Sequence, residues 1–122
     1  MTVFFYDSYA IIEFINNNKN FFPYFENNTG IITIFNLVEI YYSILNESGK
    51  EKADTALDIL FPITIEPSKE TIKEAMVFRL QNKRKKLSYA DCIGYTVASE
   101  RSIAFLTGDT QFKGLHNVIF IK

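Results

Sequence analysis

Four acidic residues stand at predicted junctions between strands and helices: Asp7, Glu39, Asp91 and Asp109. Asp7 and Asp109 each follow a short apolar segment, whereas Glu39 and Asp91 lie near the starts of predicted helices. In an open parallel sheet these junctions can lie on one edge, where such folds bind ligands. Carboxylates crowded within ~4–6 Å destabilise a fold unless a cation neutralises them. The hard cations Mg²⁺ and Mn²⁺ take oxygen ligands, so the pattern indicates a candidate acidic metal site, which suits phosphodiester hydrolysis.

Each acid taken alone also has a structural explanation. Aspartate is a favoured helix N-cap, and an acid in a first helical turn interacts well with the helix dipole. Asp91 follows Ser88 by three residues, close to a capping-box pattern. A second interpretation therefore stays open, in which the acids are caps and the chain is a non-catalytic RNA- or protein-binding module. Metal binding would separate the two interpretations.

A third interpretation is a receiver-like or small phosphatase domain, which also uses clustered acids and Mg²⁺. Such a receiver needs an aspartate at the end of its third strand. The predicted third strand here ends in Glu66 and Pro67, which speaks against this class.

The elements that would position the acids alternate along the chain, which predicts an α/β fold with a mainly parallel sheet of four to five short strands. Strands are expected at Thr2–Tyr6, Gly30–Ile34, Pro62–Ile65, Ser102–Leu106 and Asn117–Ile121. Helices are expected at Tyr9–Ile15, Phe21–Phe25, from an Asn36 N-cap to Ser48, Lys50–Leu60, Pro67–Asn82 and Ser88–Glu100. No repeat or linker interrupts this order, so residues 1–122 are expected to form one domain.

Composition limits the class of protein. The chain is 48% hydrophobic and 22% charged, which is typical of globular and not of disordered proteins. No segment is long and apolar enough for a membrane span, and Asp7 within the first apolar stretch argues against a signal peptide. The single cysteine, Cys92, cannot form an internal disulfide, so a cytoplasmic location is expected, with Cys92 as a helix-packing residue.

The charge distribution says more than the net charge of −1, which gives no overall attraction to nucleic acid. Lys83, Arg84, Lys85 and Lys86 form a basic run just before Ser88. Such a run is usually a solvated loop, but beside an acidic site it would grip phosphates.

Other catalytic classes find little support. His116, the only histidine, lies in a predicted turn before the last strand and is expected to be a surface residue. No glycine-rich phosphate loop and no nucleophile elbow is present.

The segments around the acids resemble the four signature blocks of PIN domains, and most of all those of the small VapC-type toxins of bacterial and archaeal toxin–antitoxin pairs. The blocks are Asp7-Ser8 after the first strand, Asn36–Glu39, Leu87–Asp91 and Leu106–Phe112. They occur in order over essentially the entire chain, and the last two have a spacing similar to the family's.

The resemblance implies a three-layer α/β/α domain that acts as a Mg²⁺- or Mn²⁺-dependent ribonuclease on single-stranded or looped RNA. It implies that Asp7 and Asp91 are the most direct metal ligands, and that Glu39 and Asp109 help to hold the metal or orient the water. Ser8 and Thr107 would line the site with hydroxyls. Many relatives carry arginine where this chain has Gly108, so one possible phosphate contact is missing.

The same resemblance implies a homodimer and a cognate antitoxin that inserts a peptide near the site. Aromatic residues are numerous in the first half of the chain. We expect most of them in the core and some on the dimer or antitoxin surface: Phe21, Phe22, Tyr24, Phe25, Tyr41 and Tyr42.

Overall fold

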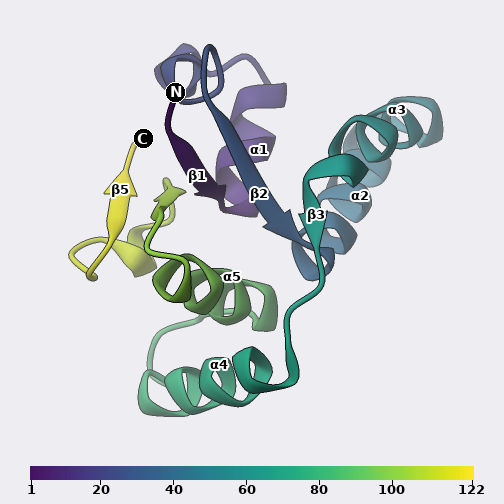
Figure 1. Ribbon diagram of the computed structural model, residues 1–122. Helices are drawn as coiled ribbons and strands as arrows, with labels where there is room; N and C mark the ends of the chain where they lie inside the picture. The colour runs from purple at the N-terminus through teal and green to yellow at the C-terminus, as the bar shows by residue number, and fades with distance from the viewer.

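One five-stranded parallel sheet forms the centre of the molecule, in the order β3-β2-β1-β4-β5 (Figure 1). The structure is a computed structural model that describes residues 1–122. The strands are β1 (Val3–Tyr6), β2 (Thr29–Thr33), β3 (Thr64–Ile65), β4 (Ala104–Thr107) and β5 (Val118–Phe120). Parallel pairing of all five strands confirms the predicted fold class.

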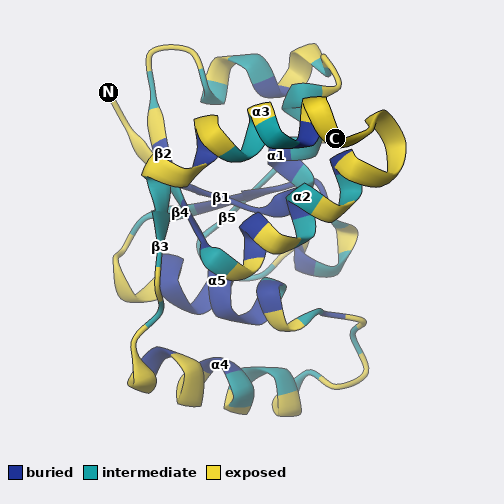
Figure 2. Cartoon of the chain, turned by 90° about the vertical axis from the view of Figure 1, so that its right-hand side faces the viewer, coloured by how far each residue is buried: buried dark blue, intermediate teal, exposed yellow.

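Helices cover both faces of this sheet. They are α1 (Ser8–Ile15), α2 (Ile34–Ser48), α3 (Lys50–Leu60), α4 (Lys69–Gln81) and α5 (Tyr89–Glu100). Short 3₁₀ helices occur at η1 (Lys19–Tyr24), η2 (Phe61–Ile63) and η3 (Thr110–Phe112). Helices α1 to α3 pack on one face, and α5 packs on the other with α4 outside it (Figure 2). The three-layer α/β/α arrangement is therefore confirmed.

Side chains along the central strands point alternately to the two faces of the sheet, so the hydrophobic core has two parts. Phe4 and Tyr6 of β1 face α1 to α3, whereas Phe5 faces α5. The ring of Phe5 stacks on that of Phe105 of β4, with centroids 5.5 Å apart. Because a strand covered on both faces buries every side chain, the strands read as continuous apolar runs. Cys92 of α5 is fully buried in the second core, as expected of a packing residue.

The aromatic residues of the first half behave largely as predicted. Phe21 is fully buried, and Phe22, Tyr24, Phe25 and Tyr41 are partly buried. Tyr42 on α2 is the exception, because 70% of it is exposed. Most of this set therefore belongs to the core side of the molecule.

The predicted start of α2 was wrong. Thr33, and not Asn36, is the N-cap, and the helix begins at Ile34. The Thr33 hydroxyl accepts the Asn36 N–H, and the Asn36 side chain accepts the Thr33 N–H in return. Both residue types are good caps, so the sequence alone could not separate a cap from the third helical position of a capping box.

Other predicted elements also differ from those in the structure. Residues Phe61–Ile63 form η2, so β3 begins only at Thr64; Pro62 has no N–H to give to a strand. Ser102 has a positive φ of 54°, which ends the turn after α5 and delays β4 to Ala104. The aromatic segment near Pro23 is a 3₁₀ helix and not an α-helix. None of the helices is long and apolar enough to cross a membrane.

Candidate acidic metal site

The sheet brings the four predicted acids to one edge. Asp7 directly follows β1, and Asp109 lies two residues after β4, the neighbouring parallel strand. Helices α2 and α5, which carry Glu39 and Asp91, both begin at this carboxyl edge of the strands. Topology therefore assembles acids that are up to 102 positions apart in sequence, Asp7 and Asp109.

Asp7 is the most deeply buried of the four acids and is only 2% exposed. Its Oδ1 accepts the Ser8 N–H at 2.9 Å, and its Oδ2 accepts the Thr107 hydroxyl at 2.7 Å. The Thr107 oxygen accepts the Asp109 N–H at 3.0 Å in its turn. Thr107 thus ties the ends of β1 and β4 together and fixes the Asp7 carboxylate.

A chain of side-chain hydrogen bonds holds Glu39. The Ser8 hydroxyl donates to Glu39 Oε1 at 2.9 Å, and Asn36 Nδ2 donates to the Ser8 oxygen at 3.0 Å. Asn36 is fully buried. It was absent from the predicted site residues, although its spacing of three from Glu39 puts both side chains on one face of α2. That spacing is the signal that could have found it.

Three of the four acids do cap helices, as the non-catalytic interpretation expects. Asp7 caps α1, and Asp109 Oδ1 accepts the Gln111 N–H of η3 at 2.9 Å. Asp91 forms a full capping box with Ser88: its Oδ2 accepts the Ser88 N–H at 2.8 Å. Glu39 lies beyond the first turn of α2, so capping does not explain its position.

The charges of the four acids act on one another. Burial, and then the charge of Asp91, raise the pKa of Asp7 to about 8, with a further contribution from Asp109. Burial also raises the pKa of Asp91 to about 6, to which Glu39 and Asp109 add. Each acid therefore lies within the field of at least one other. Capping alone does not require such crowding, whereas a bound cation would relieve it.

The donors fit a hard divalent cation in chemistry. They are carboxylate and hydroxyl oxygens, and Mg²⁺ is commonly bound through one or two carboxylates with water completing its coordination. No group of three or more acidic, histidine or cysteine side chains lies close enough together to ligate one ion directly. A cation at this edge would therefore be held through one or two carboxylates, with water as its other ligands.

Steric crowding explains why position 108 is a glycine. A Cβ there would collide with the Ile121 carbonyl oxygen and the Tyr9 ring, so an arginine has no room on this backbone. Lys122 nevertheless brings a positive charge to this turn, because its Nζ donates to the Gly108 oxygen at 3.0 Å.

The basic run borders the loop of Asp109. Lys85 Nζ donates to the Gln111 carbonyl oxygen at 2.9 Å, which ties the segment between α4 and α5 to η3. Lys85 of the basic run therefore lies against the segment that follows Asp109. His116 is exposed and makes no side-chain hydrogen bond to any of the four acids.

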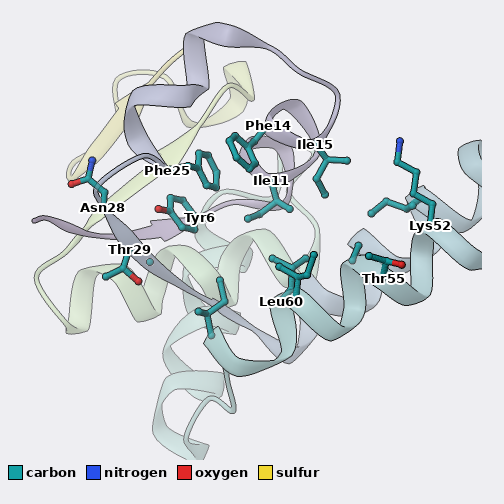
Figure 3. A pocket seen from close by; sticks show the side chains of 15 residues that line it. Tyr6, Ile11, Phe14, Ile15, Phe25, Asn28, Thr29, Lys52, Thr55 and Leu60 are labelled. Carbon is teal, nitrogen blue, oxygen red and sulfur yellow. The ribbon is translucent and has the colours of Figure 1, made fainter.

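A cavity of about 430 Å³ lies away from the acids, on the α1–α3 side of the sheet. Figure 3 shows the side chains that line it. Its lining is mostly apolar and includes Tyr6, Ile11, Phe14, Phe25 and Leu60, but none of the four acids. The candidate site is instead a polar edge of the sheet, where Asp7 is buried and the other three acids are partly exposed.

Comparison with known proteins agrees with this geometry. The family model of the PIN domain matches residues 4–117 of the chain, which includes all four acids. No curated protein sequence matches. The match excludes the receiver-like interpretation.

Solved structures of toxins share the fold. VapC20 of Mycobacterium tuberculosis, a sarcin–ricin loop cleaving toxin, is 13% identical, with a TM-score of 0.83 over 99% of this chain and 100% of its own. A toxin–antitoxin complex from Klebsiella pneumoniae gives 17% identity, a TM-score of 0.71 and coverages of 98% and 96%. VapBC2 from Rickettsia felis, bound to a promoter DNA fragment, is 18% identical, with a TM-score of 0.72 over 100% of both chains. The chain belongs to the PIN domain family.

Proposed function

We propose that the protein is a Mg²⁺- or Mn²⁺-dependent endoribonuclease that cuts single-stranded or looped RNA, and that it is the toxin of a toxin–antitoxin pair. The observation that carries this proposal is the Asp7 carboxylate, buried beside Asp91 and Asp109 with its pKa raised to about 8. A fold holds such a group at a cost to stability, which is typical of functional sites. The likeness to VapC20, a toxin that cleaves the sarcin–ricin loop, supports RNA as the substrate.

The residues of the chain divide the work. Asp7 and Asp91 would hold the metal, and Glu39 and Asp109 would help to hold it or to orient the attacking water. Thr107 fixes Asp7, and Ser8 with Asn36 fixes Glu39, so neither carboxylate swings away. When bound, a divalent metal lowers the pKa of a water and offsets the charge that develops on the phosphodiester oxygens.

We further propose a cognate antitoxin and a homodimer. The Klebsiella and Rickettsia structures are of toxins with their antitoxins, which supports a protein partner for this chain. Helix α2 carries exposed Val38, Tyr42 and Leu45, which are 65%, 70% and 38% exposed. Their spacing forms one apolar stripe that begins next to Glu39. A partner that covers this stripe would lie beside the acids.

The test is cleavage of pooled single-stranded RNA by the purified protein with Mn²⁺, Mg²⁺ or EDTA. We expect metal-dependent cutting that Asp7→Asn and Asp91→Asn each reduce by about 100-fold or more, because losing a residue that only orients a ligand already costs about 10- to 100-fold. Asp58→Asn, an exposed acid of α3, is the matched control and should leave cleavage unchanged.

The rival function is a non-catalytic RNA- or protein-binding module, which the capping bonds of Asp7, Asp91 and Asp109 favour. It predicts the same background cutting for wild type and both variants. Calorimetric titration with Mn²⁺ then decides: a module whose acids only cap helices binds no metal, and that result would overturn the enzymatic proposal.

A further inference from the structure

An exposed aromatic ring flanks the acidic site. Tyr89 is the first residue of α5, directly after the Ser88 cap and two positions before Asp91, and it is 59% exposed. The Arg79 guanidinium of α4 stacks on its ring, with Cζ 4.4 Å from the centroid. Arg79 Nε also donates to the Leu87 carbonyl oxygen at 3.2 Å. Arg79 therefore covers one side of the Tyr89 ring, and much of the rest of the ring is exposed to solvent.

Tyr89 is close to Asp91 in sequence, but its side chain does not point toward the acids. Side chains two residues apart on a helix do not face each other, so Tyr89 and Asp91 project in different directions. The Tyr89 ring faces α4, whereas Asp91 faces the other acids. This arrangement suits a residue that positions a substrate and takes no part in the chemistry.

Exposure alone does not make a site, because single exposed apolar residues are normal. Phe61 of η2, for example, is 61% exposed. Tyr89 differs in having a stacked cation and in lying at the acidic edge. It also lies next to the basic loop, defined as Lys83–Lys86, which ends two residues before Ser88.

The basic loop surrounds a hollow of its own. Residues Leu80–Lys85 line a cavity of about 250 Å³ in which Lys83, Arg84 and Lys85 supply the charge. Lys85 anchors this loop to Gln111, two residues beyond Asp109. The stacked ring shares the first turn of α5 with Asp91, and the basic loop is bonded to the segment that follows Asp109. A bound single strand uses features of these kinds: aromatic rings that stack bases and cations that contact phosphates.

We infer that the open surface of Tyr89 stacks a nucleobase of the bound RNA next to the scissile phosphate, while the basic loop contacts the neighbouring phosphates. The inference rests on the proposed function, since it names a positioning residue of that same site. Every nucleobase presents an aromatic face, so such a platform fixes the strand without selecting its sequence.

The test measures RNA binding in the cleavage-deficient Asp7→Asn background with Mn²⁺, using short single-stranded RNAs that carry 2-aminopurine at successive positions. We expect 2-aminopurine fluorescence to be quenched at one position. Tyr89→Ala should abolish this quenching and weaken binding about 5- to 150-fold, the range for one lost base–aromatic stack. Tyr89→Phe, which keeps the ring, should retain both, and Phe61→Ala should match the parent.

The outcomes separate this inference from the proposed function. If wild type cleaves RNA but Tyr89→Ala keeps the quenching and affinity of the parent, the platform is wrong and the nuclease stands. If Tyr89→Ala changes only the sedimentation of the protein, the ring belongs to a protein interface and the inference is equally wrong. If neither cleavage by wild type nor binding by Asp7→Asn is found, both proposals fall.

Discussion

At the scale of single residues, Asp7 shows most clearly what the site costs the fold. A buried carboxylate normally sits beside a cation or ionises less readily. Here it receives two hydrogen bonds that favour its charge, from Ser8 and Thr107. Burial and the neighbouring acids outweigh them, since the net effect raises the pKa of Asp7 to about 8. Without a metal, the fold therefore favours the neutral, protonated form of Asp7 over the carboxylate.

This imbalance predicts how the stability of the metal-free protein depends on pH. In the folded chain the pKa of Asp7 is about 8, against 3.8 for an ordinary aspartate. The folded state therefore binds more protons between these values, so the free energy of unfolding falls as pH rises from about 4 to 8. Asp91, with a pKa of about 6, adds to the fall between about 4 and 6. The shifts of the two aspartates together span about 6 pKa units. The fall is therefore on the order of 5–10 kcal/mol, most of it from Asp7, since one pKa unit corresponds to about 1.4 kcal/mol.

Thermal unfolding in EDTA across this pH range measures the slope. Asp7→Asn should flatten much of it and raise the melting temperature at pH 8, whereas the exposed Asp58→Asn should keep the slope of wild type. Saturating Mn²⁺ should raise the melting temperature of wild type most at high pH, because the metal binds the deprotonated acids. A melting temperature of wild type that stays level from pH 4 to 8 in EDTA would show that Asp7 is not crowded.

At the scale of elements, the positions of Glu39 and Asp91 depend on where α2 and α5 begin. The sequence predicts these helix starts only in part. Ser88 caps α5 as the sequence indicates, and α4 begins at Lys69, two residues after the predicted start at Pro67, with Ser68 as its N-cap. Thr33 and Asn36 are both good caps, so the start of α2 was misplaced, and with it the role of Asn36. The tie from Asn36 through Ser8 to Glu39 depends on how α1 and α2 pack, which local pattern does not contain.

The close approach of α5 to the sheet gives a prediction in which packing opposes helix propensity. Gly94 of α5 faces Phe5 of β1, and an added Cβ would lie 2.7 Å from the Phe5 ring. Propensity alone would make Gly94→Ala stabilising by about 1 kcal/mol. Overpacking a tight core costs about 1–3 kcal/mol, so we expect a net loss of stability. The midpoint of urea unfolding should fall, with the slope of the transition unchanged.

An alanine on an exposed helix surface provides the comparison. Asp58→Ala in α3 should change the free energy of unfolding by about 0.5 kcal/mol or less. If Gly94→Ala proved more stable than wild type, α5 would lie farther from the sheet than the structure shows, and the position of Asp91 at the edge would need revision.

At the scale of the whole molecule, the arrangement of charge matters more than its sum. The net charge is −1, yet the acidic edge and the basic loop adjoin each other through Lys85 and Gln111. The run Lys83–Lys86 is plain in the sequence, but its position beside Asp109 depends on the hairpin-like return of α4 onto α5. Long-range placement of this kind is what the sequence pattern could not supply.

This separation of charge predicts a strong salt dependence of RNA binding despite the negative net charge. The affinity for single strands falls with salt at a slope of about −0.7 per neutralised phosphate, so contacts from the basic loop should give about −2 to −3. Lys83→Ala and Arg84→Ala should each reduce the magnitude of the slope by about 0.7. Each variant neutralises one phosphate fewer, so binding releases one counterion fewer. Lys69→Ala, an exposed lysine at the opposite end of α4, should leave the slope unchanged. Equal slopes for all three variants and wild type would show that RNA approaches the acidic edge without crossing the basic loop.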